Sequence, residues 1–168
     1  AYFAAGCFWG VEEYFRQVDG VLQATSGYMG GTSDEPDYQS VCSGDTGHAE
    51  TVRVLFDPKQ VTYRELLARF FSIHDPTTVD RQGNDVGSQY RSAIFYIGEG
   101  QAKTAQEILA SLTRRAVFNA PIVTELVQAE KFYPAEDVHQ RYLERHPFGY
   151  CHVDLSQAKQ PLSGRFGG

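Results

Sequence analysis

Strand-like and helix-like apolar patterns alternate along this chain, and this alternation constrains the fold more than any other feature. Apolar residues recur at every second position between His48 and Asp57, the period of a half-buried strand. Between Val11 and Val18 they recur at spacings of three and four residues, which is typical of a helix with one buried face. The strand segments are few, and several alternate rather than being continuously apolar. This pattern favours a mixed sheet with packed helices over a doubly wound parallel sheet.

We therefore predict an α+β fold of the two-layer, ferredoxin-like sandwich type, with long functional loops. The predicted strands cover 2–5, a segment from 21, 48–57, 93–97 and 122–127, and the predicted helices cover 11–18, 66–74, 105–112 and a short segment within 134–146. Residues 1–152 form one catalytic domain in this interpretation. Residues 153–168 have no apolar periodicity and are predicted to be a C-terminal tail or linker.

The net charge of −6 and the lack of a Lys/Arg run argue against nucleic acid or an anionic membrane as the main partner. No apolar run approaches 18 residues, so the sequence predicts no membrane span. We interpret the chain, which lacks an initiator Met, as a trimmed mature form or an excised domain. The compartment stays open, with the cytoplasm favoured and the periplasm or cell surface as alternatives.

Three cysteines stand at positions 7, 42 and 151, without a C-x-x-C pair. An odd, small number of cysteines argues against a disulfide scaffold, and their spacing argues against structural zinc. The five histidines show no H-x-x-x-H spacing either, so we predict no metal site. Individual reactive thiols are the better interpretation.

Cys7 follows a short apolar strand and Gly6, and precedes the first helical segment. A helix start favours the thiolate through its unpaired N–H groups and the helix dipole, and glycine allows a sharp turn and close approach of a substrate. A buried structural cysteine is the alternative. The sequence pattern leaves both open.

Phe8 and Trp9 directly follow this thiol. At 100° per residue Phe8 lies close to the apolar stripe of the helix, whereas Trp9 is displaced from it. The pair either packs into the core or holds an apolar group of a substrate against the sulfur.

Polar candidates lie in the loops and at a strand start: Tyr38, Glu50, Asp85 and Tyr90. Each alone is compatible with a solvated loop residue or a turn. A carboxyl group among aromatic rings would remain protonated and donate a proton, and tyrosine hydroxyls would stabilise a developing oxyanion.

The two remaining cysteines differ in their surroundings. Cys151 follows Gly149 near the end of the last helical region, where a mobile thiol can attack an oxidised sulfur; a surface thiol without function is the alternative. Cys42 follows neither a helix start nor a glycine turn, and we interpret it as a bystander.

Four motifs in order, GCFWG, GHAE, GNDVGSQYRS and GYCHVD, resemble those of peptide methionine sulfoxide reductase A over roughly residues 2–155. The resemblance implies Cys7 as the nucleophile, and we expect its sulfur to be an ionised thiolate that is open to solvent. It implies Phe8 and Trp9 as the cradle of the substrate methyl group. It implies Glu50 as the acid that protonates the sulfoxide oxygen, with Tyr38, Asp85 and Tyr90 as the remaining polar lining.

The same resemblance implies the reaction and its partners. Free or peptide-bound methionine S-sulfoxide is the substrate, Cys7 becomes a sulfenic acid, and Cys151 resolves it as a disulfide that thioredoxin reduces. No cofactor is implied, because the cysteines themselves carry the redox chemistry.

One departure concerns the end of the chain. Many members of the family carry a second recycling cysteine in a Gly-rich tail, and no cysteine follows Cys151 here. The ending resembles chains that continue into a partner reductase for the R epimer, so a fused MsrB domain is a further expectation.

Two other functions remain as alternatives at this stage. A redox sensor would toggle its Cys7–Cys151 pair with oxidants and ignore methionine sulfoxide. A peptide-binding module would keep its aromatic cage active after alkylation of Cys7.

Overall fold

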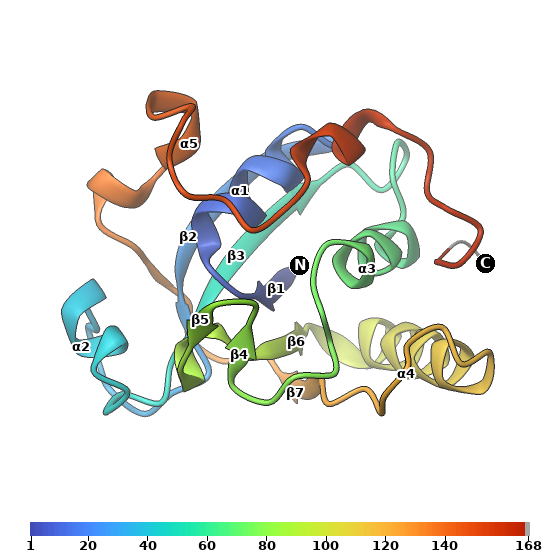
Figure 1. Cartoon of the computed structure of the whole chain (residues 1–168), viewed down its shortest axis with the longest axis horizontal. Coiled ribbons are helices and arrows are strands. Elements are labelled where there is room, and N and C mark those ends of the chain that lie inside the picture. The colour runs from blue at the N-terminus through green and yellow to red at the C-terminus, as the bar shows by residue number, and fades with distance from the viewer. Residues whose placement is uncertain (167–168) are drawn as a thin grey trace.

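The computed structural model of the chain describes residues 1–166 and is built around one six-stranded sheet (Figure 1). The strands are β1 Tyr2–Ala5, β2 Val21–Met29, β3 Ala49–Phe56, β4 Arg81–Gln82, β5 Asp85–Val86, β6 Ser92–Tyr96, β7 Glu125–Gln128 and β8 Tyr133–Pro134. The helices are α1 Phe8–Arg16, α2 Tyr38–Cys42, α3 Tyr63–Ser72, α4 Gly98–Arg114 and α5 Tyr142–Arg145. Three short 3₁₀ helices are η1 Ser88–Tyr90, η2 Asp137–His139 and η3 Leu155–Lys159.

The strand order in the sheet is β7-β6-β1-β3-β2-β8. Each neighbouring pair among the four central strands is antiparallel, α1 connects β1 to β2, and α3 lies between β3 and β6 in the chain. This is the split βαβ arrangement of ferredoxin-like folds. Helix α4 then leads to β7, which pairs with β6 in parallel and makes the sheet mixed. The predicted fold class is confirmed.

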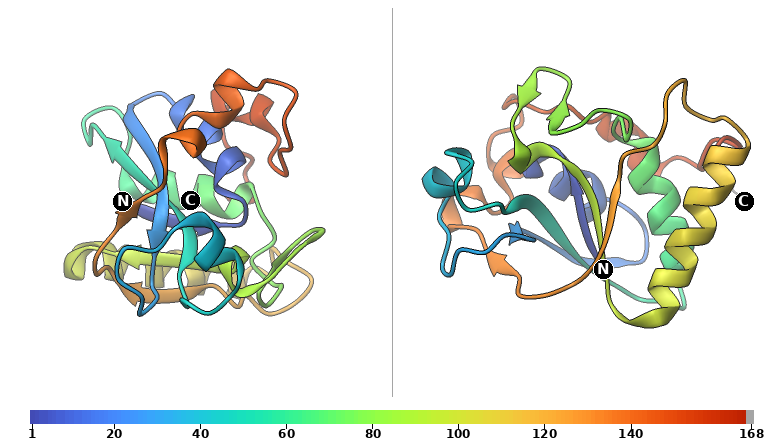
Figure 2. Two further views of the ribbon diagram at one scale, coloured as in Figure 1. Left: turned by 90° about the vertical axis from the view of Figure 1, so that its left-hand side faces the viewer. Right: turned by 90° about the horizontal axis from the view of Figure 1, so that it is seen from below.

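The main core lies between the sheet and helices α1, α3 and α4, and Figure 2 shows α3 and α4 side by side. At its centre Phe3 of β1 stacks on Phe15 of α1 and on Phe70 of α3, with ring centroids 5.2 and 5.3 Å apart. A smaller buried cluster on the opposite face contains Ala4 and Phe95. Alternate residues of β1 thus reach opposite faces, so β1 is a central, fully covered strand.

Most predicted strands and helices occur within a few residues of their expected positions, and the differences concern element starts and short segments. Helix α1 begins at Phe8, so Glu12 and Glu13 lie beyond its first turn and are buried rather than placed at the helix dipole. Helix α2 and the β4–β5 hairpin lie inside segments predicted to be loops. The predicted last helix is divided into η2 and the short α5.

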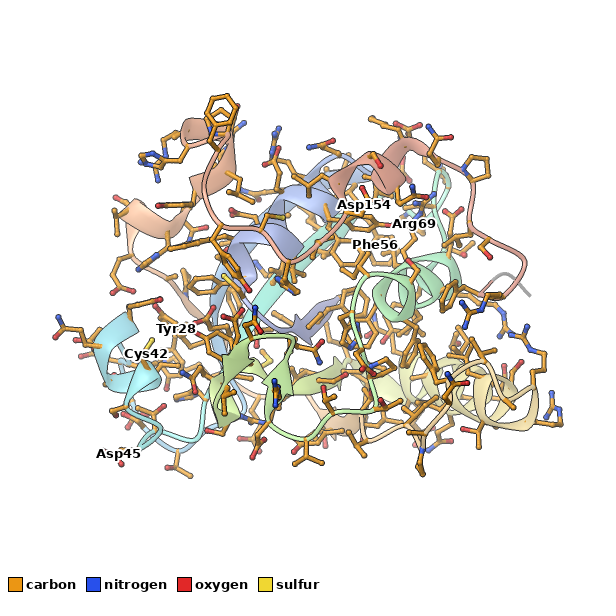
Figure 3. All side chains as sticks on the ribbon, in the orientation of Figure 1. Tyr28, Cys42, Asp45, Phe56, Arg69 and Asp154 are labelled. Carbon is orange, nitrogen blue, oxygen red and sulfur yellow. The ribbon has the colours of Figure 1, made fainter. Side chains whose placement is uncertain are left out.

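The described part of the C-terminal segment packs onto the domain rather than extending from it. Ala158 and Val153 are buried, and η3 contacts α1. The buried Arg69 of α3 holds the segment by donating to the carbonyl oxygens of Gln157, Ala158 and Gln160 at 3.3, 3.3 and 3.0 Å. Figure 3 labels Arg69 close to Asp154 of this segment. The sequence carried no signal for this packing, because main-chain carbonyls accept the hydrogen bonds. A linker role of residues 153–168 stays a prediction.

Arg69→Met is expected to lower the free energy of unfolding by about 2–4 kcal/mol, because buried and half-buried carbonyls and the Tyr14 hydroxyl lose their donor. Denaturant unfolding measures this change. Arg64→Met is the control, since Arg64 makes only an exposed pair with Glu107 and should cost less than about 0.5 kcal/mol. Equal effects of the two substitutions would contradict the role of Arg69.

Candidate active site

The end of strand β1 is where the predicted site residues meet. Gly6, with φ of +94°, turns the chain from β1 into α1, and Cys7 is the N-cap residue of that helix. The antiparallel register pairs Phe3 with Val52, which places Glu50 of β3 opposite the end of β1. Ala5 pairs with Ser92, which brings the loop before β6, with Tyr90 and Asp85, to the same end.

Glu50 is the most deeply buried carboxyl group of the site, with 1% of its surface exposed. Its Oε1 accepts the main-chain N–H of Phe8 at 3.1 Å, and its Oε2 has no hydrogen-bond partner among residues 1–166. Burial raises the pKa of Glu50 to about 8. The hydrogen bond from the Phe8 N–H lowers this pKa, and the charge of Asp85 raises it further. At neutral pH the carboxyl group is therefore predominantly protonated, in agreement with the uncharged acid expected from the sequence.

The state of Cys7 differs from the expected open thiolate. Its side chain is buried, with 8% exposed, and burial followed by the charge of Glu50 raises the pKa of the thiol well above its usual range. The first N–H group of the helix, on Phe8, is bonded to Glu50, and the Trp9 N–H lowers the pKa of the thiol by less than burial raises it. The resting cysteine is a neutral thiol, because desolvation outweighs the helix start.

The expected close approach of a substrate at Gly6 also takes another form. A Cβ atom at this position would lie 2.9 Å from Gln82 Cγ and from His152 Nε2. The space beside Gly6 is therefore filled by protein side chains rather than open to a substrate.

Tyr38 and Tyr90 contribute hydroxyl groups from two different segments, the start of α2 and η1. Burial, followed by the charge of Glu50, raises the pKa of both hydroxyls, so both remain donors at any physiological pH. Asp85 accepts a hydrogen bond from the Tyr150 hydroxyl at 2.7 Å and is near enough to raise the pKa of Glu50 and Cys7. The predicted polar residues thus surround one carboxyl group.

The two aromatic residues after Cys7 take different places. Phe8 is fully buried and packs on Tyr28, Tyr38 and His139, with ring centroids 5.5–6.4 Å apart. Trp9 is half-buried, and its ring stacks on Tyr142 with centroids 3.8 Å apart. Of the pair, only Trp9 keeps exposed surface.

The segment from Glu136 to Tyr142 organises these rings, although no motif in the sequence pointed to this segment. His139 Nδ1 accepts the indole N–H of Trp9 at 3.2 Å, and its ring stacks on Tyr38 at 4.4 Å. Glu136 accepts the Tyr28 hydroxyl at 2.8 Å and the main-chain N–H of Tyr38 at 3.0 Å. The displacement of Trp9 from the apolar stripe was the available signal that its ring required a partner outside α1.

Cys42, interpreted as a bystander, lies at the edge of this polar cluster. Its thiol is within hydrogen-bonding reach of the Tyr38 hydroxyl, and burial raises its pKa, with a further contribution from Glu50. Figure 3 shows Cys42 of α2 close to Tyr28 of β2. Cys42 and Tyr38 are four residues apart, the spacing at which neighbouring helix residues face each other.

Cys151 lies on the segment that crosses the start of α1. Its half-buried thiol donates to the carbonyl oxygen of Val153 at 3.2 Å, and burial raises its pKa. It is close enough to Cys7 to influence the pKa of that thiol. The three cysteines are free thiols.

Residues 1–166 hold neither a candidate metal centre nor a candidate membrane-spanning helix. This part of the chain contains no group of three His, Cys, Asp or Glu side chains that could hold a metal ion. Among the same residues, no helix has the length and hydropathy to cross a membrane.

A helix-capping cysteine beside a protonated carboxyl group, with a second thiol across the helix start, defines a thiol-dependent oxidoreductase. The family model described as peptide methionine sulfoxide reductase matches residues 1–166. Over 168 residues the chain is 50% identical to a peptide methionine sulfoxide reductase MsrA of Deinococcus radiodurans, covering 99% of this chain and 82% of the relative. The chain belongs to the peptide methionine sulfoxide reductase family, whose reaction is thiol-dependent reduction of methionine sulfoxide.

Two solved structures agree with this assignment. Reduced Mxr1 of Saccharomyces cerevisiae has a TM-score of 0.85 and 37% identity, covering 91% of this chain and 89% of Mxr1. Mxr1 in complex with Trx2 has a TM-score of 0.59 and 27% identity, covering 84% of this chain and 81% of that one.

Glu50→Gln is expected to lower the pKa of Cys7, because it removes the charge that is the second cause of the rise while leaving burial in place. The rate of Cys7 alkylation as a function of pH, with the modified residue identified by mass spectrometry, measures the shift. Asp85→Asn should produce a smaller shift in the same direction, since Asp85 contributes less. An unchanged or higher midpoint in Glu50→Gln would show that the carboxyl group does not act on the thiol.

Proposed function

We propose that this chain reduces methionine S-sulfoxide, free or in peptides, with Cys7 as nucleophile and Glu50 as the acid. The single observation that carries this proposal is the unpartnered Oε2 of Glu50, buried on a carboxyl group whose other oxygen accepts the Phe8 N–H. A protonated carboxyl group held in this way has one O–H left to donate. The sulfoxide oxygen is the acceptor that it suits.

The reductive step is balanced without a proton from solvent. Cys7 attacks the sulfoxide sulfur, the S–O bond of the sulfoxide breaks, and the oxygen is transferred to Cys7. Cys7–SH and the sulfoxide thus become Cys7–SOH and methionine, and the thiol proton ends on the transferred oxygen. Glu50 relays the proton: it donates to the oxygen and recovers a proton from Cys7. Both groups are neutral at rest, so charge develops only when a sulfoxide is bound.

The surrounding rings and hydroxyls orient the sulfoxide. Tyr38 and Tyr90 are the further donors to its oxygen, and their raised pKa values support that role. The partly exposed Trp9 contacts the methyl group, while the buried Phe8 packs against Tyr38. Asp85 contributes to the raised pKa of Glu50.

Regeneration proceeds through a Cys7–Cys151 disulfide. The Cys151 thiol attacks the sulfenic sulfur and water leaves, after which a thioredoxin reduces the disulfide. The complex of Mxr1 with Trx2 supports a protein of that class as the reductant. Fusion to a reductase for the R epimer also remains a proposal, which the sequence of the complete natural chain tests.

A thiol count before and after one addition of methionine S-sulfoxide, without reductant, tests the proposed function. We expect one methionine per chain and the loss of two thiols, identified by mass spectrometry as Cys7 and Cys151. The R epimer is the control and should leave all three thiols free. Loss of thiols to peroxide but not to the sulfoxide would identify a redox sensor instead.

Cys151→Ser is expected to form one methionine per chain at the wild-type rate and then stop under thioredoxin, because the sulfenic acid on Cys7 has no resolving thiol. Burst and steady-state measurements of methionine separate the two phases. Cys42→Ser is the matched control and should continue to turn over. Steady turnover of Cys151→Ser would assign recycling to another thiol.

Glu50→Gln is expected to slow the first methionine release by about 10²–10⁴-fold, the usual contribution of a general acid. The same variant should react faster with alkylating reagents at alkaline pH, where the ionised Glu50 of the wild type raises the pKa of Cys7. Rapid-mixing measurement of the first turnover provides the comparison. A wild-type rate would remove Glu50 from the acid role.

A further inference from the structure

The glycine at position 10 lies in a place where helix propensity favours another residue. Gly10 is the third residue of α1 and has no left-handed backbone conformation that would require glycine. Alanine is the better helix former, since glycine loses more backbone freedom on folding. A requirement other than helix formation therefore favours glycine at this position.

The missing side chain of Gly10 makes room for Cys151. A Cβ atom at Gly10 would lie 3.0 Å from Cys151 Sγ and 3.3 Å from Val153 Cγ2, closer than nearly all real Cβ contacts. The Cys151 sulfur thus lies directly against the backbone of α1. An alanine here would push the segment containing Cys151 and Val153 away from the helix.

The position of this sulfur relative to Cys7 follows from helix geometry. Cys7 is the N-cap residue of α1, and Gly10 is three residues later, at N3. In a capping box the N3 side chain reaches back to the N-cap residue. Because Cys151 Sγ occupies the space of an N3 side chain, it lies on the side of the helix from which Cys7 can be reached.

The segment that carries Cys151 also lies close to the backbone at Gly6. His152 Nε2 donates to the carbonyl oxygen of Ala5 at 2.8 Å, and a Cβ at Gly6 would lie 2.9 Å from that nitrogen. Residues 151–153 therefore follow the strand-to-helix turn on both sides of Cys7. Gly6 has a positive φ, so a substitution there would strain the backbone in any case, and Gly10 is the position that can be tested cleanly.

We propose that Gly10 is a positioning residue for the regeneration step. Because Gly10 has no side chain, the Cys151 sulfur can lie against the backbone of α1, where it is placed to attack Cys7. The proposal rests on the proposed function, and it assigns the two glycines around Cys7 to regeneration rather than to substrate access. In the step concerned, Cys7–SOH and Cys151–SH form the disulfide and release water. The acid and the nucleophile of the reductive step do not contact Gly10 through a side chain.

Gly10→Ala tests the proposal in two single-turnover measurements on the full chain. Methionine release after mixing with methionine S-sulfoxide should stay near the wild-type rate. Disulfide formation should slow by about 3- to 10-fold, because the neighbours of the new Cβ must move by a few tenths of an ångström and a misplacement of 1 Å costs about 100-fold. Dimedone, which traps sulfenic acids, should label Cys7 of the variant more heavily than Cys7 of the wild type.

Gly100→Ala is the matched control, because Gly100 is also the third residue of a helix, α4, and nothing lies within 4 Å of a Cβ there. It should leave both steps unchanged. A Gly10→Ala variant that forms the disulfide at the wild-type rate would overturn the proposal. So would equal slowing of both steps, or loss of the first step, since Gly10 would then serve the reductive site or the fold.

A second arm separates this proposal from the proposed function. Hydrogen peroxide can replace the sulfoxide as the oxidant that converts the Cys7 thiol to sulfenic acid, with water as the other product. The ratio of trapped sulfenic acid to disulfide should again rise in Gly10→Ala relative to wild type and Gly100→Ala. An unchanged ratio would overturn the seating role, whatever the sulfoxide experiment shows.

Discussion

The hydrogen bond from the Phe8 N–H to Glu50 is the interaction on which the rest of the site depends. It joins the start of α1 to the central strand β3 and fixes one carboxyl oxygen in a buried position. The same burial raises the pKa of the acid and of the neighbouring thiol, so the resting site carries two neutral groups. A buried carboxylate beside a thiolate would be costly, and the protein avoids it by keeping both protons until an acceptor is present.

Around this bond, the site is assembled from segments that are far apart in the chain. The antiparallel register brings β3 and the loop before β6 to the end of β1. The segment from Glu136 to Tyr142 then holds the aromatic side chains in place. His139 contacts both Trp9 and Tyr38, and Glu136 accepts a hydrogen bond from the start of α2. The C-terminal segment closes the arrangement by placing Cys151 against the first turn of α1. In the proposed function, the reductive and resolving groups therefore both lie at the start of α1.

Much of the fold and the position of Cys7 could be predicted from local patterns. Period-two alternation identified β3, helical spacing identified α1 and α3, and Gly6 marked the turn that carries the cysteine. The thiolate expected at Cys7 was wrong, because the helix start is a local property whereas desolvation depends on everything packed around it. The packing of residues 153–166 escaped prediction for a similar reason: Arg69 holds main-chain carbonyls, which every residue possesses.

The sequence by itself determined the order of elements, the chemistry available to each loop and the family to which the motifs point. These are properties of short segments, in which side-chain period and turn residues act on their immediate neighbours. Only the tertiary structure decided which protons Glu50 and Cys7 retain, which of the two aromatic side chains keeps exposed surface, and where the Cys151 sulfur lies. Those features arise from burial and contact between distant segments, and burial is a property of the folded chain as a whole.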